Sequence, residues 1–327
     1  MLGRLAPGVA GLAALSVAAS VAGCGSSASS LTSGSSRSTV RLASSSRGFP
    51  MTVRSPAGTA VIKRAPRRIV SLSPTTTEDL FAIGAGPQVA AVDSYSDYPR
   101  SAPRTKLSGF EPNVEAIANY RPDLVVISDE SPSGLARSLR TLAIPVVEDP
   151  APRTLAQAYA QIDDLGAATG HVAQARAVVA GMKTRIAALV RGTHGWGRSL
   201  TVYDELTTNL YAASSRTFVG QLLTMFGLRD IADRAPDPQG LGYPKLSAEH
   251  IVASNPAIVL LSDTICCGQS AATVARRPGW SRMRAVRDHT VVGLNDDIAS
   301  RWAPRTVELA AAIARAIGLA HAAGLRA

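Results

Sequence analysis

An internal repeat constrains the fold of this chain more than any other feature of its sequence. Residues 114–129 align without a gap to residues 248–263, so every pair is offset by the same 134 positions (249 minus 115). Each copy has a short helix that begins near a glutamate, a turn that contains proline, and a continuous apolar strand. Such strands are typical of parallel sheets, whose strands are buried on both faces. The repeat therefore predicts two α/β lobes of similar construction.

A helical run separates the two copies of the repeat. Residues 171–191 place apolar side chains at alternating steps of three and four, which puts them on one face of an α-helix. Gly170 and Gly192 are typical of helix ends, so we predict two consecutive helices, at residues 154–168 and 171–191. An ordinary helix pair within one domain is the alternative, but the repeat on either side favours a linker between lobes. The apolar positions are Val172, Ala175, Val179, Met182, Ile186 and Leu189.

Length and composition allow this two-lobe plan. With 327 residues, 46% of them hydrophobic and 18% charged, the chain can bury two cores. The predicted N-terminal lobe covers residues 67–152, the helical linker residues 153–192 and the C-terminal lobe residues 193–327. The net charge of +10 suits nucleic acid, anionic lipid or an anionic ligand. We expect no nucleic-acid binding, because the sequence shows no basic stripe interleaved with aromatic residues.

The N-terminal residues predict export and a membrane anchor. An apolar, alanine-rich segment leads into Val21-Ala22-Gly23-Cys24, so residues 1–23 have the layout of a cleavable signal peptide. The tetrad is similar to a bacterial lipobox, which implies that Cys24 receives a diacylglycerol. The protein is then lipid-anchored to the outer face of the cytoplasmic membrane. An uncleaved membrane span is the alternative, but glycine and proline interrupt the apolar segment.

A serine-rich stretch follows the lipobox. Residues 24–66 offer too little apolar surface for a core, so they predict a flexible tether. Within this tether, residues 51–53 and 60–62 flank Ser55-Pro56-Ala57-Gly58, a pattern typical of a small hairpin.

Polar and aromatic residues follow several predicted strands, at 68–72, 89–92 and 290–294. In open α/β sheets the loops at the carboxyl ends of the strands face the ligand crevice. These loops therefore carry candidate pocket residues, the alternative being that they are simply exposed loop residues. The candidates are Ser73, Pro74, Thr75, Tyr95 and Tyr98 on one wall and Asp297, Arg301 and Trp302 on the other.

Glu115 and Glu249 occupy equivalent positions in the repeat. Each follows a capping residue, Asn113 or Ser247, and lies in a first helical turn, where the helix dipole favours a carboxylate. Capping explains each glutamate singly, but it does not require the same residue at the same place in both lobes. A partner with twofold symmetry would require it.

Seven short segments follow one another along the chain: RIVSLSP at 68–74, TE at 77–78, YSDYP at 95–99, PNVEAI at 112–117, RPDLV at 121–125, SAE at 247–249 and RWAPR at 301–305. Together they resemble the substrate-binding lipoproteins of ABC importers for cobalamin, ferric siderophores and haem, with residues 94–99 most similar to the cobalamin-binding branch. The resemblance implies a class III solute-binding fold, in which two Rossmann-like lobes, joined by a long rigid interdomain helix, bind the ligand between them. It also implies a monomeric binding protein without catalytic residues, cofactor or resident metal.

The resemblance further implies roles for single residues. Glu115 and Glu249 match two docking carboxylates, which pair with arginines on the two copies of the ABC permease. Ser128 departs from the cobalamin branch, where an aromatic residue stacks on the corrin, and two arginines would equally suit an anionic ferric siderophore. The implied ligand-binding set is Ser73, Tyr95, Tyr98, Phe110, Tyr203, Arg216, Asp297, Arg301 and Trp302.

Two other functions remain as alternatives. An exported enzyme could work in the same crevice, but the sequence lacks a Gly-x-Ser-x-Gly elbow and a His-Glu-x-x-His helix, and its five histidines are scattered. A redox or metal sensor could use Cys266 and Cys267. Export favours a disulfide between them. Adjacent Cα atoms lie only about 3.8 Å apart, however, so such a bridge would be strained and the state of the two cysteines stays open.

Overall fold

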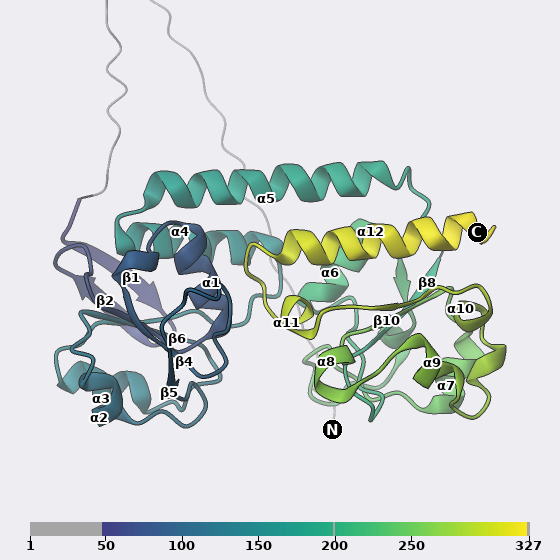
Figure 1. Ribbon diagram of the computed structural model, residues 1–327, viewed down its shortest axis with the longest axis horizontal. Helices are drawn as coiled ribbons and strands as arrows, with labels where there is room; N and C mark the ends of the chain where they lie inside the picture. The colour runs from purple at the N-terminus through teal and green to yellow at the C-terminus, as the bar shows by residue number, and fades with distance from the viewer. Residues whose placement is uncertain (1–47, 199, 326–327) are drawn as a thin grey trace, which may run out of the picture. The chain divides into compact units, whose positions relative to one another are not determined.

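The computed structural model describes residues 48–198 and 200–325, and Figure 1 shows them as two lobes with helices running across both. The predicted signal peptide, Cys24 and most of the predicted tether lie outside the described residues. The described residues belong to one compact unit. None of their helices combines the length and the apolar character that crossing a membrane requires.

The N-terminal lobe is built on a five-stranded parallel sheet with the order β5-β4-β3-β6-β7. All four residues of β6 are buried, as the apolar pattern of the first repeat copy predicts. The strands are β3 (Ile69–Ser71), β4 (Val89–Asp93), β5 (Arg104–Leu107), β6 (Leu124–Ile127) and β7 (Val146–Glu148), and the helices are α1 (Pro74–Ala82), the 3-10 turn Gly86–Gln88, α2 (Val114–Ala118) and α3 (Leu135–Thr141).

The C-terminal lobe has a four-stranded parallel sheet with the order β11-β10-β8-β9. Its strands are β8 (Thr201–Glu205), β9 (Arg229–Asp230), β10 (Ile258–Leu261) and β11 (Val291–Gly293). Its helices are α6 (Phe218–Met225), α7 (Ala248–Ser254), α8 (Thr264–Cys267), α9 (Ala271–Ala275), α10 (Arg284–Arg287), α11 (Asp296–Ala299) and α12 (Thr306–Ala322), with 3-10 turns at Ile231–Arg234 and Trp280–Arg282.

The two copies of the repeat occupy the same place in the two sheets. Strand β6 lies between the first strand of its sheet, β3, and the last, β7. In the same way, β10 lies between the first strand of its lobe, β8, and the last, β11. Helices α2 and α7 precede these strands in the chain. The prediction of two α/β lobes of similar construction is therefore confirmed, with β5 as an additional strand of the first lobe.

Helices α4 (Leu155–Thr169) and α5 (Val172–Gly192) connect the lobes, each displaced by one residue from its predicted bounds. Thr154 and Gln157 form a capping box at the start of α4, and Gly170 ends this helix with φ +86°. A Cβ atom at Gly166 would lie 2.3 Å from the Cβ of Ala175, so only glycine lets the two helices pack this closely. With α12, they form the upper layer in Figure 1.

One hydrophobic cluster runs through this layer into both lobes. It includes Ile69 of β3, Ile162 of α4, Ile186 of α5, Ile258 of β10 and Ile313 of α12, each at most 1% exposed. Because the sheets share a core with the connecting helices, separating the lobes would expose apolar surface to water. The long helix is therefore part of the fold's core and not a free connector.

The predicted hairpin is present as β1 (Met51–Ser55) and β2 (Gly58–Ile62), paired antiparallel. Its placement in the tether was wrong, because Val53, Ala60 and Ile62 are buried in the same core as the N-terminal lobe. The Ser55 hydroxyl also accepts a hydrogen bond from the backbone N–H of Glu148, which ends β7 (3.2 Å). The N-terminal lobe consequently starts before residue 67.

Candidate functional site

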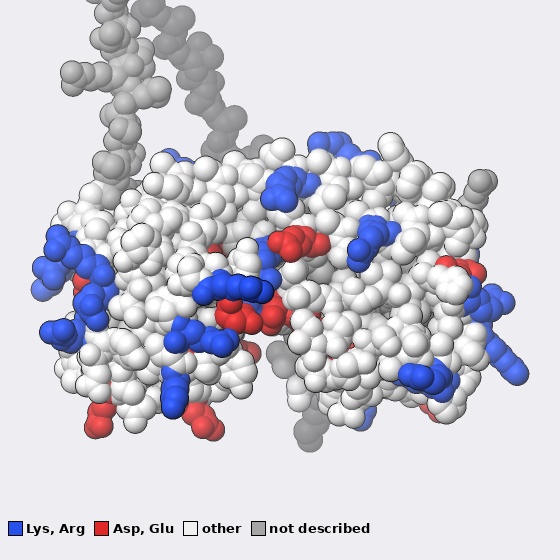
Figure 2. Space-filling model, viewed as in Figure 1, with Lys and Arg blue, Asp and Glu red and all other residues white. Residues whose placement is uncertain are grey.

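The loops at the carboxyl ends of the two sheets meet between the lobes. Arg301, which follows α11, donates hydrogen bonds to the carboxylate of Asp97 (2.9 Å) and the carbonyl of Tyr95 (3.3 Å), both in the loop after β4. Figure 2 shows the surface hollowed between the lobes, on the side away from α5. Ligands bind at this position in open α/β sheets, so we take the hollow as the candidate site.

On the N-terminal lobe, two of the predicted ligand contacts come together. Tyr95 is 60% exposed and Phe110 is 50% exposed, and their rings form a T-shaped contact with centroids 5.6 Å apart. Gly109 holds this segment in place, because a Cβ atom there would lie 2.4 Å from the carbonyl oxygen of Leu72, just after β3. The pair presents aromatic surface to solvent at the carboxyl edge of the sheet.

A network of buried hydroxyl groups supports the loop that carries Tyr95. The Thr77 hydroxyl contacts those of Ser71 and Ser96 (2.9 Å each), and Ser96 hydrogen-bonds to the carboxylate of Asp93. Ser73, another predicted ligand contact, is 5% exposed and occupies the N-cap position of α1, without a side-chain hydrogen bond to the helix. Ser73 therefore belongs to the buried network under this loop and offers little surface to a ligand.

An interlobe ion network joins the lobes above this loop; it consists of Glu78, Asp97, Asp297, Arg301 and Arg305. Arg301 is 8% exposed and pairs with Asp297 (2.7 Å), Asp97 (2.9 Å) and Glu78 (3.0 Å). Arg305 also pairs with Glu78, through its Nε atom (2.8 Å). Two cations thus face three carboxylates, so the charge of Arg301, a predicted ligand contact, is already neutralised by the protein.

The ring of Tyr98, the remaining predicted contact on this lobe, lies under the guanidinium of Arg305 (4.1 Å from its Cζ to the ring centroid). This cation–π contact extends the ion network onto the surface of the N-terminal lobe. Trp302, beside Arg301, is half-buried and packs against the main core cluster.

The prediction that Tyr203 contacts the ligand is not supported by its position. Its side chain is fully buried and meets Trp280 edge to face (centroids 6.2 Å apart) inside the C-terminal lobe. Strand β8 is covered on both faces because it lies inside a parallel sheet, so this side chain points into a core layer. Arg216, predicted as a ligand-binding cation, pairs with Asp237 at 2.8 Å.

Tyr243 is a candidate contact that the sequence analysis missed. It is 47% exposed, and burial of the rest of its side chain raises its pKa, while the charges of Asp204 and Arg153 shift it in opposite directions. Those neighbours place it between β8 and the start of α4. The repeat gave a nearby signal: Phe110 plus the offset of 134 is Pro244, the residue after Tyr243, so an exposed aromatic side chain precedes the repeat helix in both lobes, one position out of register.

Buried acids line the carboxyl ends of β8 and β10. Glu205 is fully buried and receives two hydrogen bonds of 2.6 Å from Arg277. Burial raises the pKa of Asp204 to about 7, and burial with the charge of Glu205 raises that of Asp263 to about 7. Among the described residues, no group of three or more His, Cys, Asp or Glu could hold a metal ion. These acids are buried beneath the carboxyl edge of the C-terminal sheet, and Glu205 is paired with Arg277.

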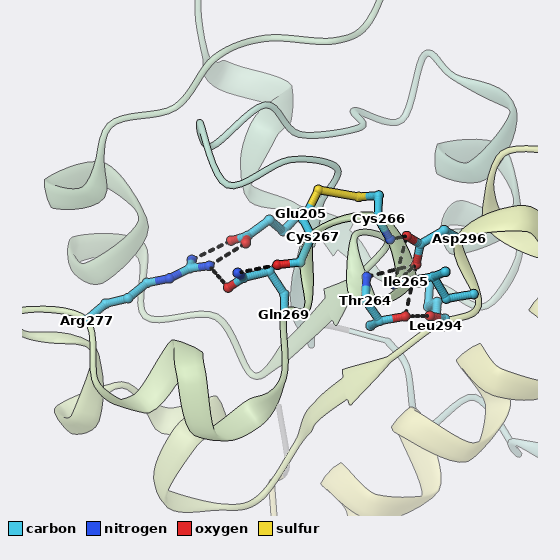
Figure 3. The surroundings of a disulfide bond; sticks show 9 residues. All are labelled: Glu205, Thr264, Ile265, Cys266, Cys267, Gln269, Arg277, Leu294 and Asp296. Carbon is cyan, nitrogen blue, oxygen red and sulfur yellow. Dashed lines mark hydrogen bonds and ion pairs between the residues drawn. A yellow bond between two sulfur atoms is a disulfide. The ribbon is translucent and has the colours of Figure 1, made fainter.

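Cys266 and Cys267, whose state the sequence left open, form a disulfide in α8 (Figure 3). The thiol groups on which a metal or redox sensor would depend are therefore bonded to each other. The carboxylate of Asp296 accepts hydrogen bonds from the backbone N–H groups at the start of α8.

Glu115 and Glu249, the predicted docking residues, are both exposed. Each is the second residue of its helix, behind the capping side chains of Asn113 and Ser247. Helices α2 and α7 lie on the side of their lobes away from α5 (Figure 1). Hydrogen bonds from its own backbone N–H and from Ser247 lower the pKa of Glu249, which keeps this carboxylate charged.

Comparisons with known proteins agree with this geometry. A family model described as periplasmic binding protein matches residues 69–298. The ABC transporter substrate-binding lipoprotein YvrC of Bacillus subtilis is 28% identical over 305 residues, which cover 90% of this chain and 92% of that protein. A cobalamin-binding protein of Halobacterium salinarum is 29% identical over 276 residues, which cover 82% of this chain and 74% of that protein.

Solved structures show the same fold. The vitamin B12 binding protein BtuF of Vibrio cholerae superposes with a TM-score of 0.63 at 21% identity, covering 78% of this chain and 98% of that chain. The siderophore binding protein BauB superposes with a TM-score of 0.68 at 17% identity, covering 83% and 99%. Since the family model spans most of the sequence, this protein belongs to the periplasmic binding protein family of ABC importers and is, as predicted, a binding protein and not an enzyme.

Proposed function

We propose that this protein captures a corrinoid such as cobalamin between its lobes and delivers it to an ABC permease while anchored to the membrane through Cys24. Its family takes up ligands of the cobalamin, siderophore and haem type, and curated relatives at 28–29% identity are named for cobalamin or vitamin B12. The choice among these ligands rests on one observation: the two arginines expected to meet the ligand already form ion pairs within the protein.

Both arginines already have carboxylate partners within the protein. Arg301 pairs with three carboxylates and Arg216 with Asp237. An anionic ferric siderophore, or the propionates of haem, would have to take these cations from their carboxylate partners. Cobalamin in its cyano form is neutral and offers a flat conjugated ring, which suits the exposed Tyr95 and Phe110 rings.

The ligand assignment is tested by equilibrium dialysis of the full chain, purified in detergent, against cyanocobalamin, hemin and a ferric catecholate. We expect saturable one-to-one binding of cyanocobalamin with a Kd of about 1 μM or lower. Saturable binding of the ferric catecholate or hemin without cyanocobalamin would contradict the charge argument. The mass of the purified chain reports whether Cys24 carries a lipid.

Loss of either exposed aromatic ring should weaken this binding. Tyr95→Ala and Phe110→Ala each remove about 1–1.5 kcal/mol of aromatic contact, so each should raise the Kd for cyanocobalamin about tenfold. Leu319→Ala is the matched control, because Leu319 is a 43% exposed apolar residue on α12, outside the proposed site. Equal affinity of all three variants and the original chain would remove the aromatic pair from the ligand site.

The docking glutamates should matter for delivery and not for capture. Glu115→Arg or Glu249→Arg places a cation where the permease is proposed to present an arginine, so uptake of labelled cyanocobalamin by cells should fall at least tenfold. The Kd of the purified variants should stay within twofold. Asp163→Arg changes an exposed carboxylate on α4 and should leave uptake unchanged. A weakened Kd with either glutamate variant would mean that the side chain serves the ligand site instead.

A further inference from the structure

We propose that Ile265 and the Cys266–Cys267 disulfide form a ligand-contact surface on the C-terminal lobe, which packs against the flat face of the bound corrin. We call these three residues the disulfide platform. The inference rests on the proposed function, because it specifies which side chains complete the corrinoid site opposite the Tyr95–Phe110 pair.

The position of α8 places the platform on the wall of the site. Helix α8 begins three residues after β10 ends, at the carboxyl edge of the C-terminal sheet. Its first turn is held by Asp296, whose neighbour Asp297 belongs to the interlobe ion network. In Figure 1, α8 and α11 lie on the side of their lobe that faces the N-terminal lobe. The exposed residues of α8 are therefore candidates for the second wall of the hollow.

The platform is apolar and unusually open to solvent. Ile265 is 62% exposed, the largest value among the exposed large hydrophobic residues of the described chain, and both cysteines are exposed. A disulfide carries no charge and is polarisable, and sulfur makes favourable contacts with conjugated rings. Exposed apolar surface of this kind indicates a binding site when a cleft lies next to it. The acids behind it, Glu205 and Asp263, are fully buried and do not reach this surface.

Hydrogen bonds on both sides hold the platform in one conformation (Figure 3). On one side, the Asp296 carboxylate accepts from the N–H groups of Ile265 (2.9 Å) and Cys266 (2.8 Å). On the other, the Gln269 amide donates to the carbonyl of Cys267 (3.3 Å) and accepts from Arg277 (2.7 Å), which pairs with the buried Glu205. The bridge itself prevents the two cysteine side chains from rotating. A surface fixed before binding loses little entropy when the ligand arrives.

The platform is tested with two variants that alter it differently. Ile265→Ser removes apolar surface and leaves the bridge, while the double variant Cys266→Ser/Cys267→Ser removes the bridge. Each should raise the Kd for cyanocobalamin about five- to tenfold in equilibrium dialysis, and Leu319→Ser should not change it. Thermal unfolding of Ile265→Ser should match the original chain, which separates a contact from a folding defect. A Kd within twofold of the original in both variants would overturn the proposal.

Protection of the bridge gives an independent readout. Saturating cyanocobalamin should slow reduction of the disulfide by dithiothreitol about tenfold, measured by labelling the released thiols with a maleimide dye. Equal reduction rates with and without bound ligand would also overturn the platform. If the original chain binds no cyanocobalamin at all, it is the proposed function that fails, so the two failures are distinguishable.

Discussion

Replacing Glu78 with alanine should lower the free energy of unfolding by about 3–5 kcal/mol, because it leaves two guanidinium groups without their shared buried partner. Glu78 lies on α1 of the N-terminal lobe and is 3% exposed. It accepts hydrogen bonds from Arg301 (3.0 Å) and Arg305 (2.8 Å), both of the C-terminal lobe. Its loss should also loosen the contact between the lobes. Urea denaturation measures the stability, and small-angle X-ray scattering measures the separation of the lobes.

A surface ion pair provides the matched control for this experiment. Arg284 and Asp288 are one helical turn apart on the surface, 4.0 Å from each other, so Arg284→Ala should cost less than about 0.5 kcal/mol. A comparably small loss for Glu78→Ala would show that water replaces the missing carboxylate. The interlobe ion network would then contribute little to holding the lobes together.

Replacing Asp149 with asparagine should stabilise the protein at neutral pH, by at most about 4 kcal/mol at pH 7. Asp149 follows β7 and is 5% exposed, and its Oδ2 atom has no hydrogen-bond partner. Burial, reinforced by the charge of Asp164, raises its pKa from 3.8 to about 8. The folded chain therefore keeps a proton that the unfolded chain releases near pH 4.

The sign of this effect can be checked against pH. Between pH 4 and pH 8 the unfolded state binds fewer protons at Asp149, so raising the pH over this range favours unfolding of the original chain. Asparagine does not titrate, so the advantage of Asp149→Asn should be near zero at pH 4, grow as the pH rises and level off above pH 8. Denaturant titrations of both chains across this range measure the difference. An advantage that does not change with pH would contradict this explanation.

Asp163→Asn is the control for the pH series. Asp163 is an exposed carboxylate on α4, and its replacement should change the stability by less than about 0.5 kcal/mol at every pH. Other buried acids, such as Asp204 and Asp263, also affect the pH dependence of the original chain. Comparing each variant with the original chain at the same pH removes their contribution.

Local patterns predicted those parts of the fold that depend on local physics. The apolar strand predicted in the first repeat copy is present as Leu124–Ile127, and α4 and α5 differ from their predicted bounds by one residue at each end, because apolar periodicity follows directly from which face is buried. The hairpin at residues 51–62 was recognised for the same reason. Its assignment to the tether was wrong. A sequence pattern can show that Val53 and Ile62 belong to an apolar face of the hairpin, but it does not show what covers that face.

The candidate site was predictable only in part, because a loop's position follows from topology and a side chain's partners do not. Tyr95 was predicted in a loop after a strand and is exposed in the loop after β4, while Phe110 was implied only by the family resemblance. Tyr203 ends in a core layer, since a strand inside a parallel sheet has no open face. Arg301 meets Glu78, 223 positions earlier in the chain, and no local pattern reports such a pairing.

The sequence by itself determined that this chain forms two similar α/β lobes connected by helices, because the repeat and the helical periodicity record burial that is local to each element. Only the tertiary structure decided which charges meet between the lobes. Folding brings acids of one lobe within 3.0 Å of Arg301 in the other lobe and leaves the Cys266–Cys267 bridge exposed after β10. These are properties of distance and solvent exposure, and residues far apart in the chain acquire them only when the lobes pack together.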